Sequence, residues 1–204
     1  MPIDFSDIQI PFLRNEEIRK RADEFREKHW GNKIPVDIEF IAERNLDLLM
    51  ITVPNLRSQA DTEAYLSGDL KEIVYDPDIP EVRIRFSVAH EIGHFVLHAE
   101  VIKKLRISSA EEWKEMQRTF PEAIWGRAEY QAREFAGRVL VPREQLVRSL
   151  KDLQNEIQKA RNLVPDLEIT VLKELVSPKI AKKFYVSDEV IVRRMDTEEI
   201  LPEM

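Results

Sequence analysis

Three of the four histidines in the chain fall within one short stretch, residues 87–98, which reads SVAHEIGHFVLH. His90 and His94 are four residues apart, so a helix would place their imidazoles on one face, one turn apart. Glu91 follows His90 directly and would lie on a neighbouring face, where it can reach a water molecule. Two imidazoles that hold zinc, with a carboxylate that takes a proton from its water, are typical of zinc hydrolases. The stretch therefore predicts a metal-holding helix with Glu91 as general base.

The third protein ligand that a catalytic zinc ion normally takes must come from another residue. The chain has no cysteine, so this ligand is His, Asp or Glu. His98 would lie about 6 Å beyond His94 along the helix axis, out of reach of an ion held between His90 and His94. We therefore expect His98 to support another side chain or to pack, and not to bind the metal.

Two carboxylates on a later predicted helix are candidates for this ligand. Glu129 shares a helix face with Arg133 and Ala136, where small residues permit close packing, and should point toward the two histidines. Glu134 would lie about 140° away around the helix and would pair with Arg138, four residues further on. We predict Glu129 as the ligand, with Glu134 as the alternative.

Composition indicates a globular chain with one main domain. Its 204 residues are enough to bury a sizeable core, and 43% of them are hydrophobic. The net charge of -7 gives no overall attraction for nucleic acid or for an anionic membrane. No window approaches the roughly 18 apolar residues of a membrane span, and residues 1–7 lack the features of a signal peptide. We expect a cytoplasmic protein.

The remaining pattern predicts an α+β fold. Three short β-rich segments, at 48–53, 62–66 and 72–75, precede the histidine helix, and residues 67–70 look like a hairpin turn. So few short strands favour a small three-stranded sheet packed on that helix over a sandwich or barrel. The predicted helices cover 15–30, 35–42, 83–99, 111–116 and 125–142, then a long amphipathic helix from 142 and short helices at 169–176, 180–184 and 190–195.

The C-terminal residues 180–194 resemble a helix-turn-helix with local positive charge. DNA binding is one interpretation, but a packed helical hairpin that steadies the main domain or meets a partner agrees better with an acidic chain. We divide the chain into residues 1–160, the main domain with an N-terminal helical cover, and residues 161–204, a helical C-terminal segment. The basic side chains are Lys182, Lys183, Arg193 and Arg194.

Two long segments together resemble the ImmA/IrrE family of metallopeptidases. They are HEIGHFVLH at 90–98 and the pattern ExxAxxFAxxxLxP at 129–142. Arg133 departs from the family, which usually has Asn at this position. Shorter similar segments, at 35–43, 64–66, 73–76, 85–89 and 180–187, extend the resemblance over most of the chain from about Pro35 to Arg194.

The resemblance implies a zincin-like metallopeptidase core, with metal bound by His90, His94 and Glu129 and with Glu91 as general base. Zinc suits two imidazoles and a carboxylate best, with manganese and iron as alternatives. The family implies a cytoplasmic peptidase, commonly acting on a helix-turn-helix repressor in stress response, mobile-element control or toxin–antitoxin pairs. The alternative is a non-proteolytic metal-binding toxin or regulatory protein that acts by binding its partner. The candidates for stabilising the oxyanion are Tyr65, Tyr75 and Tyr130.

Overall fold

The computed structural model describes residues 8–202 of the chain. The predicted absence of a signal peptide at residues 1–7 therefore lies outside the described residues. The described part contains eleven α-helices, one π-helical turn and one small mixed sheet, which confirms the α+β class. None of the helices in residues 8–202 is both long enough and apolar enough to cross a membrane.

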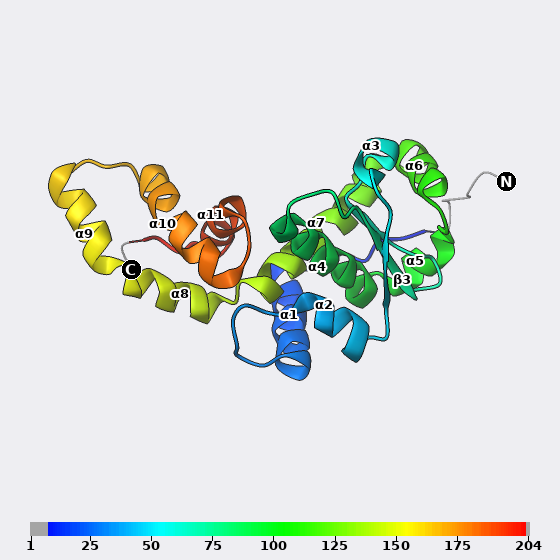
Figure 1. Cartoon of the computed structure of the whole chain (residues 1–204), viewed down its shortest axis with the longest axis horizontal. Coiled ribbons are helices and arrows are strands. Elements are labelled where there is room, and N and C mark those ends of the chain that lie inside the picture. The colour runs from blue at the N-terminus through cyan, green and yellow to red at the C-terminus, as the bar shows by residue number, and fades with distance from the viewer. Residues whose placement is uncertain (1–7, 203–204) are drawn as a thin grey trace.

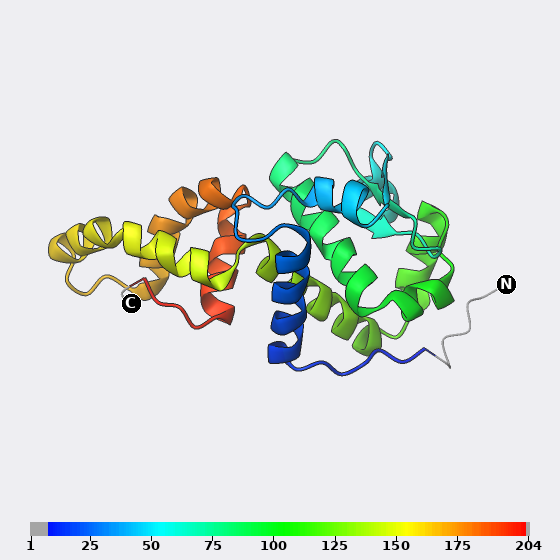
Figure 2. The ribbon, with the colours of Figure 1, turned by 90° about the horizontal axis from the view of Figure 1, so that it is seen from below.

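The helices form two groups along the longest axis of the molecule. The sheet and helices α3 to α7 lie at one end, and α8 to α11 lie at the other, with α1 between the two groups (Figures 1 and 2). The helices are α1 (Asn15–His29), α2 (Ile38–Phe40), the π-helical turn η1 (Ile41–Asn45), α3 (Leu56–Ala60), α4 (Glu81–Leu97), α5 (Ala99–Leu105), α6 (Ala110–Thr119), α7 (Glu122–Leu140), α8 (Arg143–Asp152), α9 (Gln154–Leu163), α10 (Ile169–Phe184) and α11 (Asp188–Thr197).

The three predicted strands form one sheet in the order β1-β3-β2. The strands are β1 (Leu49–Thr52), β2 (Ala64–Leu66) and β3 (Glu72–Tyr75). The predicted segments are therefore confirmed, the third with the same ends and the first two with ends shifted by at most two residues. β1 runs parallel to β3, whereas β2 pairs with β3 in antiparallel fashion through the predicted hairpin. β2 and β3 contact α4, so the sheet packs on the helix that carries the histidines.

Helices α4 and α7 form the central pair of the fold and pack closely together. Gly93 allows this approach, because a Cβ added there would lie 2.9 Å from the carbonyl oxygen of Ala132 and 3.0 Å from its Cα. Val88 and Ile92 on α4, and Phe135 on α7, are fully buried. Helix α4 ends at Leu97, two residues before the predicted end, and α5 begins almost directly after it.

The predicted long helix from Pro142 is wrong, because α8 ends at Asp152 and α9 begins at Gln154. Leu153 between them has φ -97° and ψ 3°, outside the helical region. Leu153 and Ile157 are both buried. The break thus bends the chain while both apolar side chains remain in the core.

The two short helices predicted at 169–176 and 180–184 are one continuous helix, α10, with Pro178 inside it. Proline removes one helical hydrogen bond and normally ends or kinks a helix. Val176, Ile180 and Phe184 are buried on both sides of the proline, so tertiary packing holds the two halves together. Helices α3 and α5 were not predicted. Helix α6 was predicted, and Ser109 caps it by accepting a hydrogen bond from the Glu112 N–H at 3.2 Å.

The C-terminal helices are joined to the rest of the chain by a buried arginine. Arg194 on α11 is 2% exposed and donates to Glu134 on α7 at 3.1 Å and also to Glu198. Lys183 is paired with Asp152 at 2.9 Å. Fewer basic groups are therefore available to DNA than the sequence indicated. The helix-turn-helix resemblance and the domain boundary at 160 stay predictions, and α8 and α9 lie beside α10 and α11 (Figures 1 and 2).

Candidate metal centre

His90, His94 and Glu129 converge where α4 meets α7. One ligand atom of each lies within 4.8 Å of the other two. The His94 Nε2 atom lies 3.1 Å from His90 Nε2 and 3.2 Å from Glu129 Oε1. The second carboxylate oxygen of Glu129 lies 3.1 Å from His90 Nε2. The structure thus brings together two imidazole nitrogens from one helix and a carboxylate from another.

The local sequence explains this convergence. The two histidines are one helical turn apart on α4, and Gly93 between them lets α7 approach. Glu129 lies one turn before Ala132, the residue that Gly93 contacts, so its carboxylate reaches the histidines across the narrow gap. Glu134 is directed elsewhere and is bonded to Arg194.

The predicted pairing of Glu134 with Arg138 is wrong. Arg138 instead donates to the two carboxylate oxygens of Asp23 at 2.8 and 2.6 Å and also binds Glu198. Helix α1 and the end of α11 provide these carboxylates close to Arg138, and an isolated helix offers neither. Tertiary partners have therefore replaced the local pairing of residues four apart.

In the metal-free cluster, the Glu129 carboxylate and the two histidines stabilise each other's charged forms. Burial acts to lower the pKa of His90, but the neighbouring Glu129 carboxylate outweighs burial and raises that pKa above its ordinary value. Arg133 acts on His90 in the opposite direction. Burial acts to raise the pKa of Glu129, but the two histidines hold that pKa far below its ordinary value. Glu129 is therefore an anion throughout the physiological pH range.

Glu91 lies beside the cluster and is 4% exposed. Burial raises the pKa of the Glu91 carboxyl above its ordinary value, while His94 and His90 act to lower it. A backbone hydrogen bond from Leu66, at the end of β2, also favours the charged form. Such a carboxylate, buried and close to the ligands, has the environment of a general base.

A chain of buried polar groups extends from His94 into the core. His94 Nδ1 lies 3.2 Å from His98 Nδ1, and His98 Nε2 lies 2.8 Å from Gln131 Oε1. Gln131 in turn donates to the carbonyl oxygen of Pro11 at 2.9 Å. The three side chains are 1–2% exposed, and burial lowers the pKa of His98 to about 4, so His98 is neutral at pH 7.

This series of hydrogen bonds determines which nitrogen of each imidazole ring carries a hydrogen atom. The amide of Gln131 donates to Pro11, so its oxygen accepts from His98 Nε2, and His98 Nδ1 is left to accept from His94 Nδ1. The Nε2 atom of His94 is then free of hydrogen and faces the cluster, as a metal ligand requires. Sequence reasoning kept His98 out of the ligand set but missed Gln131. It also missed Trp125, which stacks on the His94 ring at 5.4 Å with an interplanar angle of 4°.

The donor atoms suit a zinc ion in chemistry and in spacing. Two ligands about 2.0–2.1 Å from a tetrahedral zinc ion lie roughly 3.3 Å apart. The two histidine nitrogens lie 3.1 Å apart, and each lies 3.1 or 3.2 Å from one of the two carboxylate oxygens of Glu129, which is close to this value. The residues present therefore fit a divalent metal ion.

Two hollows flank the cluster along α7. One has a volume of about 510 Å³ and includes Trp125, Gly126 and Glu129, with Phe120 and Lys114 opposite them. The other, about 130 Å³, lies at the next turns of α7 and is shared with α4 and α11. Glu129 of the cluster lines the first hollow, and Arg133, one helical turn further along α7, lines the second. The second hollow is lined by Phe86, Arg133, Glu134, Gly137, Glu189, Val190, Arg193 and Arg194.

The outer edge of β2 leads to the cluster. The Ser67 N–H donates to Glu72 at 2.9 Å across the hairpin, and backbone directions alternate along a strand. The backbone groups of Ala64 and Leu66 consequently face away from β3, toward Glu91. Beyond Leu66 this edge is covered, because the Gly68 N–H donates to the carbonyl oxygen of Ile107 at 2.7 Å.

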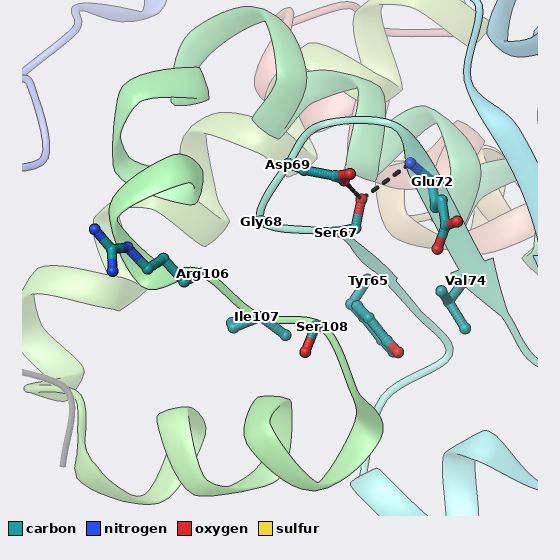
Figure 3. Close-up of a pocket in the computed structure, with 9 residues that line it drawn as sticks. All are labelled: Tyr65, Ser67, Gly68, Asp69, Glu72, Val74, Arg106, Ile107 and Ser108. Carbon is teal, nitrogen blue, oxygen red and sulfur yellow. Dashed lines mark hydrogen bonds between the residues drawn. The ribbon is translucent and has the colours of Figure 1, made fainter. Parts of the chain in front are cut away.

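A further hollow of about 350 Å³ lies behind this covered end. Figure 3 shows β2, β3 and their turn on one side of it, and the segment Arg106 to Ser108 on the other. Tyr65 lines this hollow and stacks on Trp113 at 5.7 Å. Tyr130 donates to Asn15. Neither contact directs a phenol toward the metal cluster.

Comparison with known families gives one match. A family model described as the IrrE N-terminal-like domain, Peptidase_M78, matches residues 49–196. The chain belongs to this peptidase family. The Peptidase_M78 match covers the sheet, α4 and α7, and so confirms the resemblance to the ImmA/IrrE family. No curated protein matches the chain.

Proposed function

We propose that this chain is a cytoplasmic, zinc-dependent endopeptidase that cleaves a specific protein partner. The observation that carries the proposal is the convergence of His90, His94 and Glu129 beside the buried carboxylate of Glu91. Membership of the Peptidase_M78 family supports peptide-bond hydrolysis. Manganese or iron is an alternative to zinc, since the same donors bind them.

In the proposed site, His90, His94 and Glu129 would hold the ion. A divalent cation bound there supplies Lewis-acid polarisation of the scissile carbonyl and lowers the pKa of water toward roughly 7. The buried chain through His98 and Gln131 keeps the His94 Nε2 atom free of hydrogen and fixes the ring. The negative charge of Glu129 offsets part of the positive charge that binding adds.

Glu91 would carry the proton transfers. Its carboxylate takes a proton from the attacking water and then delivers it to the nitrogen of the leaving amine. Burial raises the pKa of this carboxyl, which makes it a stronger base than an exposed glutamate.

The substrate would lie in an extended conformation along the outer edge of β2. A peptide would pair with the Ala64 N–H and the Leu66 carbonyl oxygen, as when a strand is added to a sheet edge. The Leu66 N–H is bonded to Glu91, and the Ala64 carbonyl oxygen accepts from the Thr62 hydroxyl at 2.7 Å. The contact between Gly68 and Ile107 limits this edge to the part nearest Glu91. We propose a helix-turn-helix repressor or an antitoxin as the partner, with a role in stress response or in a toxin–antitoxin pair.

Cleavage of the protein encoded by a neighbouring gene tests this function. The zinc-loaded protein should cut it, a chelator should stop the cut, and Glu91→Gln should keep zinc but lose cleavage by at least about 100-fold. His94→Ala should lose both. Cleavage by Glu91→Gln at the wild-type rate would show that the mechanism is wrong. A partner that the wild-type protein binds with metal present but never cuts would favour the non-proteolytic regulator.

A further inference from the structure

The small hollow between α4, α7 and α11 lies next to the metal cluster and is not used by the chemistry described above. Arg133 lies four residues after Glu129, and Phe86 lies four residues before His90. Both are therefore about 6 Å from the cluster along their helices. The hollow has a volume of about 130 Å³, which suits one side chain better than a helix or strand.

The charges lining this hollow do not cancel. Arg133 and Arg193 are exposed, and within residues 8–202 neither guanidinium has an ion-pair partner. Arg194 also lines the hollow, but it is neutralised by Glu134. Glu189 is the remaining acidic residue of the lining. Two free cations against one anion leave a positive hollow on a chain whose net charge is -7.

The position of the hollow relates it to a bound peptide. An extended chain advances about 3.4 Å per residue. A peptide whose scissile bond lies at the cluster therefore brings the first or second side chain beside that bond to the hollow. A guanidinium presents a planar fork of N–H groups that matches a carboxylate.

We propose that this hollow is a specificity subsite that binds an acidic side chain of the substrate, Asp or Glu, through Arg133 and Arg193. The carboxylate replaces the ion-pair partner that these two arginines lack within the described chain. Phe86 and Val190 line the same hollow and contact the methylene groups of the side chain. This subsite rests on the proposed peptidase function, because the metal fixes where the peptide lies.

Binding of peptide hydroxamates to the zinc-loaded full chain tests the subsite. The hydroxamate group anchors each probe at the metal, so the measurement does not depend on turnover. Four probes carry Glu or Gln at the first or the second residue from the hydroxamate, and calorimetry gives each affinity. At one of the two positions the Glu probe should bind about five- to tenfold more tightly than the Gln probe. This preference should shrink at high salt.

Matched variants separate the subsite from general charge effects. The double variant Arg133→Gln/Arg193→Gln should abolish the preference for Glu, and Glu189→Gln should increase it. Arg148→Gln, which changes an exposed arginine on α8, should leave it unchanged.

Equal binding of the Glu and Gln probes at both positions, or a preference that survives in the double variant, overturns the subsite while the peptidase proposal stands. If none of the probes binds, the metal centre is wrong, and the peptidase proposal is overturned together with the subsite.

Discussion

Replacement of Gly93 by alanine tests whether the close approach of α4 and α7 builds the metal centre. The added Cβ would lie 2.9 Å from the Ala132 carbonyl oxygen, whereas ordinary contacts begin at 3.4 Å, so the helices must separate by about 0.5 Å (3.4 minus 2.9). The atoms that the added Cβ meets belong to the backbone of Ala132 and cannot rotate away as a side chain could. Overpacking of this kind costs about 1–3 kcal/mol, and the better helix propensity of alanine returns up to about 1 kcal/mol. With about 1 kcal/mol returned, we expect a net loss of up to about 2 kcal/mol.

This loss should be visible in both stability and metal binding. For a chain of this size, a loss of about 2 kcal/mol lowers Tm by about 4–8 °C. Metal sites accept ligand distances only within about 0.2 Å, so a shift of 0.5 Å between His94 and Glu129 should weaken zinc binding by about tenfold or more. Thermal unfolding and competition with a chelating indicator measure the two effects.

Gly126, a glycine on α7, provides the control for Gly93 on α4. A Cβ at Gly126 would meet nothing within 4 Å, so Gly126→Ala should stabilise the helix by about 0.5–1 kcal/mol and keep zinc affinity. If Gly93→Ala is as stable as Gly126→Ala and binds zinc equally well, the close approach of the helices does not build the site.

The remaining predictions concern the ligands and their support. Glu129→Ala should lose bound zinc, measured as metal content after dialysis, whereas Glu134→Ala should keep zinc but unfold more easily; the reverse pattern would exchange the two assignments. His98→Phe should keep the fold but weaken zinc binding about 10–100-fold, because the His94 Nδ1–H loses its acceptor. Unchanged affinity would make His98 a packing residue. In the metal-free protein the pKa of His98 is about 4 against 6.5 when unfolded. The unfolded chain therefore binds the extra proton, and stability should fall as the pH drops from 6.5 to 4. Urea unfolding should show a flatter pH profile for His98→Phe.

The helical periods of the sequence were enough to anticipate the meeting of α4 and α7. The spacing of His90 and His94, and the small residues Gly93 and Ala132, depend only on local helix geometry. The hairpin that ends at β3 could also be predicted, because β-rich composition and a turn are local signals. The coarse α+β architecture followed from these elements.

Contacts between distant residues could not be derived in this way. Gln131 supports His98 only because α7 lies against α4, and nothing in its immediate neighbours marks this role. Arg138 was expected to pair four residues back, with Glu134. Asp23, 115 residues away in sequence, binds it instead. Separate helices were expected at 169–176 and 180–184, but the burial of apolar side chains on both sides of Pro178 outweighs the free-energy cost of a proline inside a helix.

The ion pair between Glu134 and Arg194 limits how this chain can change in evolution. Glu134 is 7% exposed and lies on the same helix as Glu129. If α11 were exchanged for an unrelated segment that still covered Glu134, this carboxylate would lose its closer cation and keep only the longer contact to Arg19, 3.9 Å away, at a cost of up to about 3–5 kcal/mol. A relative that carries a different C-terminal segment must therefore supply a cation at this point or lose Glu134 at the same time. The two substitutions should occur together.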